Sequence, residues 1–212
     1  MKGIKVLSKH MPDMFEKILG YEEYLPKIEA ANGNKEKLRE IFWNDLADDY
    51  RWEFINGEIV LRSGFNMQNA IFSQNLSMAL FAYVRERALG LVLTGRCVCS
   101  FSENDYSPTA FYYRKEIADG FKADTNRFPV PAMILELNDE NTEENNRSVK
   151  FTDYEKNSVE EYWMLNSNDK SIEQYINRKG ILDFEQKLFS GDVLTSKVIE
   201  GFTMGVSEIF EV

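Results

Sequence analysis

The chain has 212 residues, of which 43% are hydrophobic and 13% are aromatic. This composition suffices for one substantial core and excludes extended disorder. The formal net charge is −10, from 35 acidic and 25 basic residues, which argues against tight binding to nucleic acid through its phosphates. No apolar run approaches the ~20 residues that span a bilayer, and the N-terminus has no signal-peptide pattern. We therefore expect a cytoplasmic protein that does not interact with membranes.

Histidine and cysteine are too few to supply the common catalytic groups. The one histidine, His10, is far in sequence from the two cysteines, Cys97 and Cys99, so neither a catalytic triad nor a zinc site is expected. Cys97 and Cys99 occupy alternate positions of a predicted strand and point to the same face, where they are poorly placed for a disulfide with each other. We expect two buried free thiols. Carboxylates, lysine and a metal ion are the remaining chemistry.

Residues 1–50 are expected to be largely helical. Apolar residues recur at helical spacing over residues 12–31 and again over residues 34–49. A Gly/Asn-rich break separates the two stretches. We therefore expect two helices, the first of which is an accessory element.

A hairpin and a long helix are predicted next. Residues 52–62 are typical of a β-hairpin, because apolar residues flank Asn56-Gly57, the preferred pair for a type I′ turn. Residues 66–90 then carry apolar side chains three and four positions apart, which predicts an amphipathic helix closed by Gly90.

The rest of the chain alternates between strands and helices. Residues 131–137 are apolar on both faces, as expected of a central strand covered by helices. Residues 142–157 are predicted to be helical, with Thr142 as the cap. Further strands are predicted at 91–101, 109–113, 160–166, 171–177 and 181–189, with a short strand and turn at 195–210. The pattern predicts an α/β (α+β) fold with a mixed central sheet flanked by helices, divided into an N-terminal helical extension (1–50) and a main domain (51–212).

Glu136 and Lys150 are the residues most suited to a chemical role. Glu136 lies near the end of the apolar strand, where a carboxylate is costly unless it is paired or bound to a metal. Lys150 precedes Tyr154 by four residues on the predicted helix, so the two share a face, and an inward Tyr154 directs Lys150 toward the sheet. Two interpretations are open on the residues alone: a buried ion pair, which is the favoured one, or a metal ligand beside a catalytic lysine.

Four stretches of the sequence follow one known family pattern: WEFINGEIV, SPTAFYY, ILELNDENTEENNRSVKFTDYEKNSVEEYWMLN and GDVLTSKVIEGFTMGVSEIF. They correspond, in order, to four parts of the family pattern. These are an opening Y-E-L-I-D-G-E hairpin, a P-D strand, a long block that runs from E-V-L-S to E-Y-W, and a closing strand that contains an S and a G at fixed positions. On these motifs, from residue 52 to residue 210, the chain resembles the Uma-two family of putative restriction endonucleases, a branch of the PD-(D/E)xK nuclease superfamily. The long central block is the specific part of the match.

The resemblance implies a restriction endonuclease-like fold and a site that can be transferred residue by residue. The family's P-D aspartate, a metal ligand, falls on Thr109, and its strand-end glutamate, a second ligand, is Glu136. Its helical lysine, which would support the attacking water or the phosphate, is Lys150, and the hairpin glutamate is Glu53. The family's frequent histidine at the start of the long helix falls on Asn69.

Several positions depart from the family pattern in the same direction. Thr109 replaces the aspartate, and Asn56, Asn69 and Asn146 stand where the family has ionisable side chains. The cofactor implied by the family is Mg²⁺, which prefers several hard oxygen ligands, and a neutral hydroxyl is a weaker ligand than a carboxylate. We expect Thr109, Glu136, Lys150 and Glu53 to converge in one cleft, with Asn69 and Tyr154 at its rim.

Two hypotheses follow. The first is a metal-dependent endonuclease, a hydrolase of phosphodiester bonds, that is degenerate or weakly active and binds DNA weakly. The second is a non-catalytic interaction or dimerisation module on the nuclease fold, forming a homodimer. Two nearby acids, Asp105 and Asp139, are interpreted as solvated loop residues that do not compensate for Thr109. No Gly-rich phosphate loop or cofactor motif supports a small-molecule enzyme.

Overall fold

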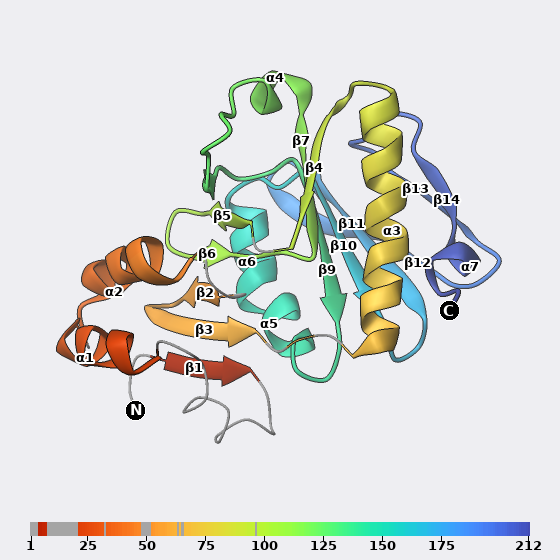
Figure 1. Cartoon of the computed structure of the whole chain (residues 1–212). Coiled ribbons are helices and arrows are strands. Elements are labelled where there is room, and N and C mark those ends of the chain that lie inside the picture. Colours follow the sequence, from red (N-terminus) through yellow and green to blue (C-terminus); the bar gives the residue numbers. More distant parts are fainter. Residues whose placement is uncertain are drawn as a thin grey trace.

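The computed structural model describes residues 4–7, 21–31, 33–47, 52–62, 64, 66–95 and 97–212. Within these ranges the strands form two six-stranded sheets and one two-stranded sheet, with helices packed around them (Figure 1). The predicted class, a mixed sheet flanked by helices, is confirmed. None of the helices within the described ranges is long and apolar enough to cross a membrane.

The core sheet contains the strand that was predicted to be central. Its order is β12 (Ile181–Leu188), β11 (Ser171–Arg178), β10 (Glu161–Asn166), β9 (Met133–Asn138), β7 (Ala110–Arg114) and β4 (Gly90–Thr94). The β9–β10 pair is parallel and the other pairs are antiparallel. All six residues of β9 are buried, because both faces of the sheet are covered.

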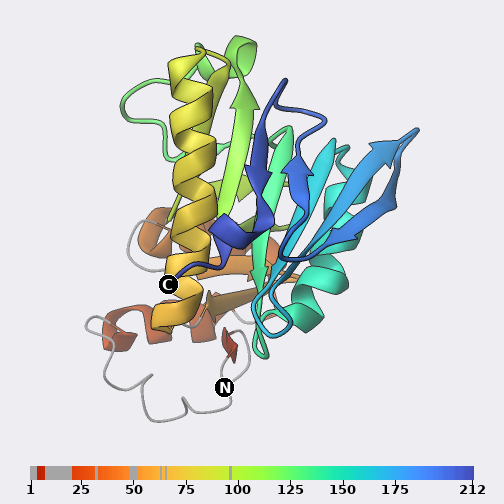
Figure 2. The ribbon, with the colours of Figure 1, turned by 90° about the vertical axis from the view of Figure 1, so that its right-hand side faces the viewer.

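The two faces of the core sheet pack against different partners. Helix α3 (Met67–Glu86) and the C-terminal segment cover one face (Figure 2). This segment comprises β13 (Val193–Thr195), β14 (Thr203–Gly205) and α7 (Val206–Ile209). Met133, Leu135 and Leu137 of β9 point to this face, while Ile134 packs on the other with residues of α6 and of the N-terminal sheet. Glu136, two residues beyond Ile134, is thereby directed to the second face.

The N-terminal sheet is built around the predicted hairpin. Its order is β1 (Ile4–Leu7), β3 (Glu58–Arg62), β2 (Trp52–Ile55), β6 (Asp105–Tyr106), β5 (Val98–Ser100) and β8 (Arg127–Phe128). Asn56 and Gly57 connect β2 to β3 with φ values of 53° and 85°. Both residues are therefore in the left-handed region that a type I′ turn requires, and the predicted hairpin is confirmed.

The N-terminal helices pack on this hairpin. Helix α1 (Tyr21–Ala31), helix α2 (Lys35–Ile41) and the π-helix η2 (Phe42–Leu46) bury a shared apolar cluster against β2 and β3. One part of the helical prediction for residues 1–50 is wrong, because Ile4–Leu7 is a strand paired in parallel with β3. Residues 12–20 of the first expected helix, and His10, lie outside the described residues.

Gly90 does not end the long helix as predicted. It begins β4 with a φ of 145°, and a Cβ there would lie 2.0 Å from the Tyr113 carbonyl oxygen of β7. Ala88, with a φ of 51°, takes the left-handed position after α3 instead. The glycine is needed for the close approach of two strands, which is a different reason from helix capping.

Two further elements differ from the prediction. The expected strand at 91–101 is two strands, β4 and β5, that belong to different sheets. Cys99 is buried in β5 as expected, whereas Cys97 is half-buried; both thiols are free. The expected helix at 142–157 divides at Ser148 into α5 (Glu143–Arg147) and α6 (Val149–Lys156). A one-turn helix, α4 (Lys115–Ala118), follows β7.

Thr142 does not cap α5 through its side chain. Its hydroxyl instead donates a hydrogen bond of 2.9 Å to the Leu137 carbonyl. Asn146 is buried and donates to the same carbonyl at 3.1 Å and to the Asn138 Oδ1 at 2.7 Å. These hydrogen bonds anchor helix α5 to the end of β9. Helix α6 packs separately from it.

Candidate active site between the two sheets

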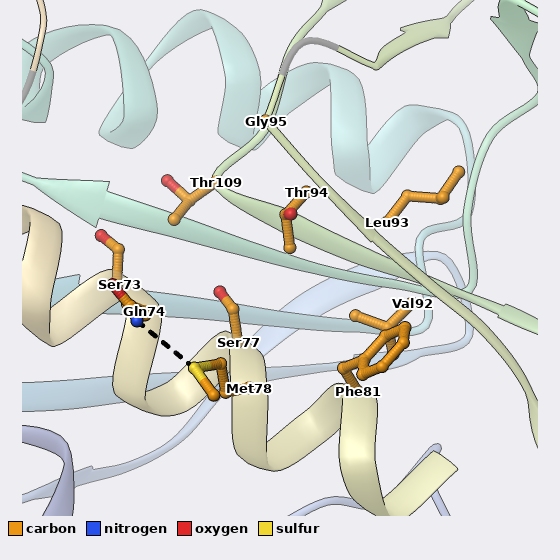
Figure 3. A pocket seen from close by; sticks show the side chains of 10 residues that line it. All are labelled: Ser73, Gln74, Ser77, Met78, Phe81, Val92, Leu93, Thr94, Gly95 and Thr109. Carbon is orange, nitrogen blue, oxygen red and sulfur yellow. Dashed lines mark hydrogen bonds between the residues drawn. The ribbon is translucent and has the colours of Figure 1, made fainter. Parts of the chain in front are cut away.

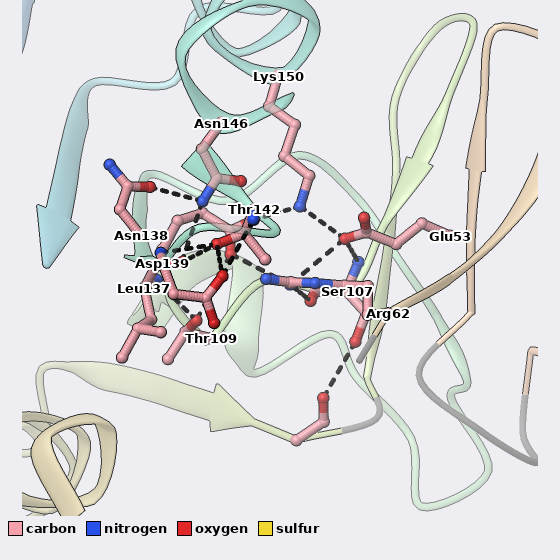
Figure 4. A network of polar contacts seen from close by, with 12 residues as sticks. Glu53, Arg62, Ser107, Thr109, Leu137, Asn138, Asp139, Thr142, Asn146 and Lys150 are labelled. Atoms are coloured by element: carbon pink, nitrogen blue, oxygen red, sulfur yellow. Dashed lines mark hydrogen bonds and ion pairs between the residues drawn. The ribbon is translucent and has the colours of Figure 1, made fainter. Parts of the chain in front are cut away.

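Two carboxylates and two cationic side chains meet between the sheets, and Figure 4 shows Glu53, Arg62 and Lys150 directed toward one another. Lys150 Nζ lies 2.7 Å from Glu53 Oε1 and 2.6 Å from Glu136 Oε1. Arg62 Nη1 lies 3.2 Å from Glu136 Oε2 and 3.5 Å from Glu53 Oε1. These four side chains, the four-charge cluster, are at most 1% exposed. Their charges therefore interact with little screening by water.

Strand alternation explains why these residues share one space. In the hairpin, Glu53 pairs directly with Val60, so both point to the same face, and Arg62 follows Val60 by two residues. Val60 packs in the same apolar cluster as Ile134 of β9. The hairpin face that carries Glu53 and Arg62 is thus laid against the sheet face that carries Glu136.

Helix α6 supplies the remaining cation and a phenol. Lys150 is 1% exposed and Tyr154 is fully buried, which confirms the predicted inward face of this helix. The Tyr154 hydroxyl donates a 3.1 Å hydrogen bond to Glu136 Oε1. Burial, followed by the Glu136 charge, raises the pKa of Tyr154 well above its ordinary value, so Tyr154 remains a hydrogen-bond donor. It lies inside the cluster, not at the rim where we expected it.

Arg62 also belongs to the site, although no sequence motif indicated it. Besides the two carboxylates, its Nη1 donates a 2.6 Å hydrogen bond to the Ser107 carbonyl. Burial alone would lower the pKa of Arg62, but the Glu136 and Glu53 charges outweigh burial and raise it. The signal available in the sequence was hairpin register, because the Asn56-Gly57 turn fixes Arg62 on the same face as Glu53.

Thr109 lies beside Glu136, where the resemblance placed a metal-binding aspartate. Its Oγ1 is 3.5 Å from Glu136 Oε2 and accepts a 3.0 Å hydrogen bond from the Leu137 amide. The residue immediately precedes β7, which pairs with β9. The Thr109 hydroxyl therefore links the start of β7 to β9. In β9 it contacts both the Leu137 backbone amide and the Glu136 carboxylate. This is a structural role that does not need a charge.

The residues expected around the rim are engaged in hydrogen bonds. Asn69 is 5% exposed, and its Nδ2 donates to Asp139 Oδ2 at 3.4 Å. The other Asp139 oxygen accepts from the Asn141 and Thr142 amides and from the Thr142 hydroxyl, which shapes the turn after β9. The interpretation of Asp139 as a simply solvated acid is therefore wrong.

Asp105 is also not a solvated loop acid. It is fully buried in β6, and its two oxygens accept from Arg39 Nε at 2.6 Å and Arg39 Nη2 at 2.8 Å. This bidentate pair attaches helix α2 to the N-terminal sheet. Asp105 is committed to that pair and supplies nothing to the space beside Thr109.

The residues of the cluster, as arranged, do not fit a divalent metal ion. Mg²⁺ requires several hard oxygens in near-octahedral geometry and usually retains water. Both Glu136 oxygens are already contacted, Oε1 by Lys150 and Tyr154 and Oε2 by Arg62. Over the ranges that the structure describes, no three His, Cys, Asp or Glu side chains converge in a way that could hold a metal. Two positive charges already balance the two carboxylates.

A groove of ≈ 560 Å³ lies beside the cluster (Figure 3). It runs between α3 and strand β4, and its lining includes Ser73, Met78 and Phe81 on one side and Thr94 on the other. Among the site residues described above, Thr109 is the one that lines this groove. Glu53, Glu136 and Lys150 do not line it.

The arrangement defines a class of protein. A central strand of a mixed sheet ends near a glutamate, and the following helix returns a lysine to that glutamate, as in restriction endonuclease-like folds. The same fold is seen in the crystal structure of a putative nuclease belonging to DUF820 from Anabaena variabilis ATCC 29413. The two share 10% sequence identity with a TM-score of 0.63, and the match covers 75% of this chain and 89% of that chain.

Residues 38–207 match the Uma2 family, described as putative restriction endonuclease, and the chain belongs to this family. The resemblance inferred from the sequence motifs is thereby confirmed. No curated protein matches the chain. Family and fold together identify a nuclease-like protein.

Proposed function

We propose that this chain is a nuclease-fold protein in which Mg²⁺-dependent cleavage of phosphodiester bonds is weak or lost. One observation carries the proposal. Glu136, the family's strand-end ligand, is held by Lys150, Arg62 and Tyr154 inside a buried cluster, and a hydroxyl stands at the second ligand position. Metal-assisted hydrolysis needs a cation that generates the nucleophile and neutralises the phosphate. Both carboxylates of the cluster are already paired with protein cations.

Lys150 supports the same conclusion. In the role implied by the family resemblance, Lys150 would assist the attacking water or the phosphate. That role requires contact with the substrate. Here its ammonium is 1% exposed and is shared between Glu53 and Glu136 at 2.7 and 2.6 Å. A phosphate could reach it only by displacing both carboxylates, and removing one member of a buried ion pair costs about 3–5 kcal/mol. Lys150 is thus engaged in structure.

Charge also disfavours a tight DNA complex. The formal net charge is −10, and the loop and helix that follow Glu136 carry Asp139, Glu140, Glu143 and Glu144. A phosphate backbone approaching this side of the molecule meets like charge. Weak DNA binding is therefore part of the proposal. The alternative of a non-catalytic interaction or dimerisation module is compatible with the same cluster and stays a prediction.

The test is a cleavage assay on supercoiled plasmid and on single-stranded DNA with Mg²⁺ or Mn²⁺. We expect the wild-type chain to cut no faster than Glu136→Gln, which keeps the shape of the side chain and removes its charge. Lys150→Ala serves as the second comparison, and circular dichroism verifies that each variant is folded. Cleavage by the wild-type chain that both substitutions abolish would establish an active nuclease and refute the proposal.

A further inference from the structure

The position of Arg62 suggests a second reason why this site does not resemble a metal centre. Two carboxylates and Lys150 alone would leave one excess negative charge buried at the interface of the sheets. Arg62 supplies the missing positive charge, and its side chain is 1% exposed. An uncompensated charge at such a place is strongly unfavourable, so some cation is required there.

Arg62 also contacts the particular oxygen that a metal would need. Glu136 Oε1 is taken by Lys150 and Tyr154, whereas Oε2 faces Thr109 at 3.5 Å. A divalent ion shared by Glu136 and a carboxylate at position 109 would bind Oε2. Arg62 Nη1 lies 3.2 Å from that oxygen, which places the guanidinium where the ion's charge would act.

The far ends of the two groups are incompletely satisfied. Arg62 Nη2 and Glu53 Oε2 are buried and have no hydrogen-bond partner among the described residues. Buried polar atoms are almost always hydrogen-bonded. The guanidinium and the Glu53 carboxylate are therefore only partly satisfied by the described residues of the cluster.

From these contacts we infer that Arg62 is the built-in cation of this site: its guanidinium occupies the position of a divalent ion between Glu53, Glu136 and residue 109, and keeps metal out. The inference rests on the proposed loss of metal-dependent cleavage but makes a separate claim. Thr109 alone does not exclude metal. Restoring the aspartate is therefore insufficient while Arg62 remains, because the new carboxylate pairs with the guanidinium.

The experiment compares four proteins: the wild-type chain, Thr109→Asp, Arg62→Met, and the double variant. Melting temperature is measured in chelator and in Mn²⁺, and Mn²⁺ binding is measured by calorimetry. We expect the double variant to melt lower than wild type in chelator, to recover that loss in Mn²⁺, and to bind one ion. Wild type and Thr109→Asp are expected to show little change with Mn²⁺.

A further substitution locates the ion. Adding Glu136→Gln to the double variant should remove Mn²⁺ binding, which distinguishes the cluster from the acidic loop after β9. Thr109→Asp combined with Arg62→Lys retains the charge and should respond to Mn²⁺ as little as Thr109→Asp alone, which separates loss of charge from loss of packing.

Three results would overturn the inference. Thr109→Asp could gain as much from Mn²⁺ as the double variant, the double variant could show no response, or it could remain unfolded with Mn²⁺ present. None of them bears on the proposed function, which fails only if the wild-type chain cleaves DNA. The two claims can therefore be refuted independently.

Discussion

At the scale of single residues, Thr109 and Arg62 both lie beside Glu136 Oε2. Thr109 contributes a hydroxyl that accepts from the Leu137 amide, and Arg62 contributes the charge that a metal would bring. Thr109 and Arg62 Nη1 both contact neighbours that belong to the fold. The position beside Glu136 is therefore part of the protein's interior, because both side chains are buried.

Glu136 and Lys150 could be placed from the sequence, since an acid in an apolar strand and a lysine one turn before an aromatic each break a local pattern. Arg62 breaks no such pattern at the end of a strand, where charged residues are common. Its burial depends on which surface the hairpin face meets. That contact is tertiary, and sequence periodicity does not report it.

Gly90 offers a residue-scale prediction. Gly90→Ala should destabilise the protein more than Gly95→Ala at the other end of β4. Both positions have positive φ, but a Cβ at Gly90 would lie 2.0 Å from the Tyr113 carbonyl, whereas a Cβ at Gly95 meets nothing within 4 Å. Backbone strain should cost about 1–2 kcal/mol at Gly95, and displacement of β7 a further ~1–3 kcal/mol at Gly90. Urea unfolding of both variants provides the comparison; equal losses would show that the approach of β7 is not limiting.

At the scale of elements, the segment after β9 shows where prediction was incomplete. The pattern of residues 142–157 predicts one helix, whereas the structure divides this segment at Ser148. Helix α5 is fixed by Asn146 to the end of β9 and by Arg147 to Glu173 of β11, with contacts of 2.7 and 3.0 Å. These partners are distant in sequence, so the local pattern could not reveal that the two halves are anchored separately.

The Arg147–Glu173 pair predicts a pH dependence. Burial alone would raise the pKa of Glu173, but hydrogen bonds from Arg147 and Tyr175 outweigh burial and lower it to about 2. Because the pKa of Glu173 in the folded state lies below its ordinary value of 4.5, the pair stabilises the fold fully above that value, and this stabilisation is lost as pH falls toward 2. Glu173→Gln should thus lower the melting temperature at pH 7.

The same variant should differ less from wild type as the pH approaches 2. Thermal melts of both proteins from pH 7 down to the lowest pH at which wild type is folded would measure this. Glu143→Gln is the matched control, since it removes the exposed partner of Arg147 and should have little effect at any pH. A constant difference between wild type and Glu173→Gln across this range would contradict the prediction.

At the scale of the whole molecule, the four-charge cluster joins three parts of the fold: the hairpin of the N-terminal sheet, the central strand of the core sheet, and helix α6. Fold class and central strand could be predicted because their apolar patterns are strong. The packing of the two sheets against each other could not be predicted, because the sequence pattern indicates one sheet with a helical extension. The N-terminal strand β1 and the short strands β5, β6 and β8 carry little local signal.

Lys150→Ala should therefore weaken the whole fold. Removal of one cation leaves two buried carboxylates with Arg62 alone, and we expect a loss of about 3–5 kcal/mol. The loss should be nearly the same in low and high salt, because buried charges are poorly screened. Lys115→Ala, which removes a pair with Asp119 whose side chains are 57% and 62% exposed, should cost less than about 0.5 kcal/mol. Denaturant unfolding at two ionic strengths distinguishes the variants, and a salt-sensitive loss for Lys150→Ala would indicate a solvated site.

The same cluster constrains how the chain reaches its native state. Glu53 and Lys150 are 97 positions apart in sequence, so their contact closes a long loop, which is slow. The hairpin around Asn56-Gly57 forms locally and must then dock. The hairpin docks edge to edge, through the pairing of Phe54 in β2 with Asp105 in β6. A pairing shifted by one residue would turn Glu53 and Arg62 away from the core sheet and leave Glu136 and Lys150 without them. Such misregistered encounters should dissociate quickly, so the charges select the correct register during folding.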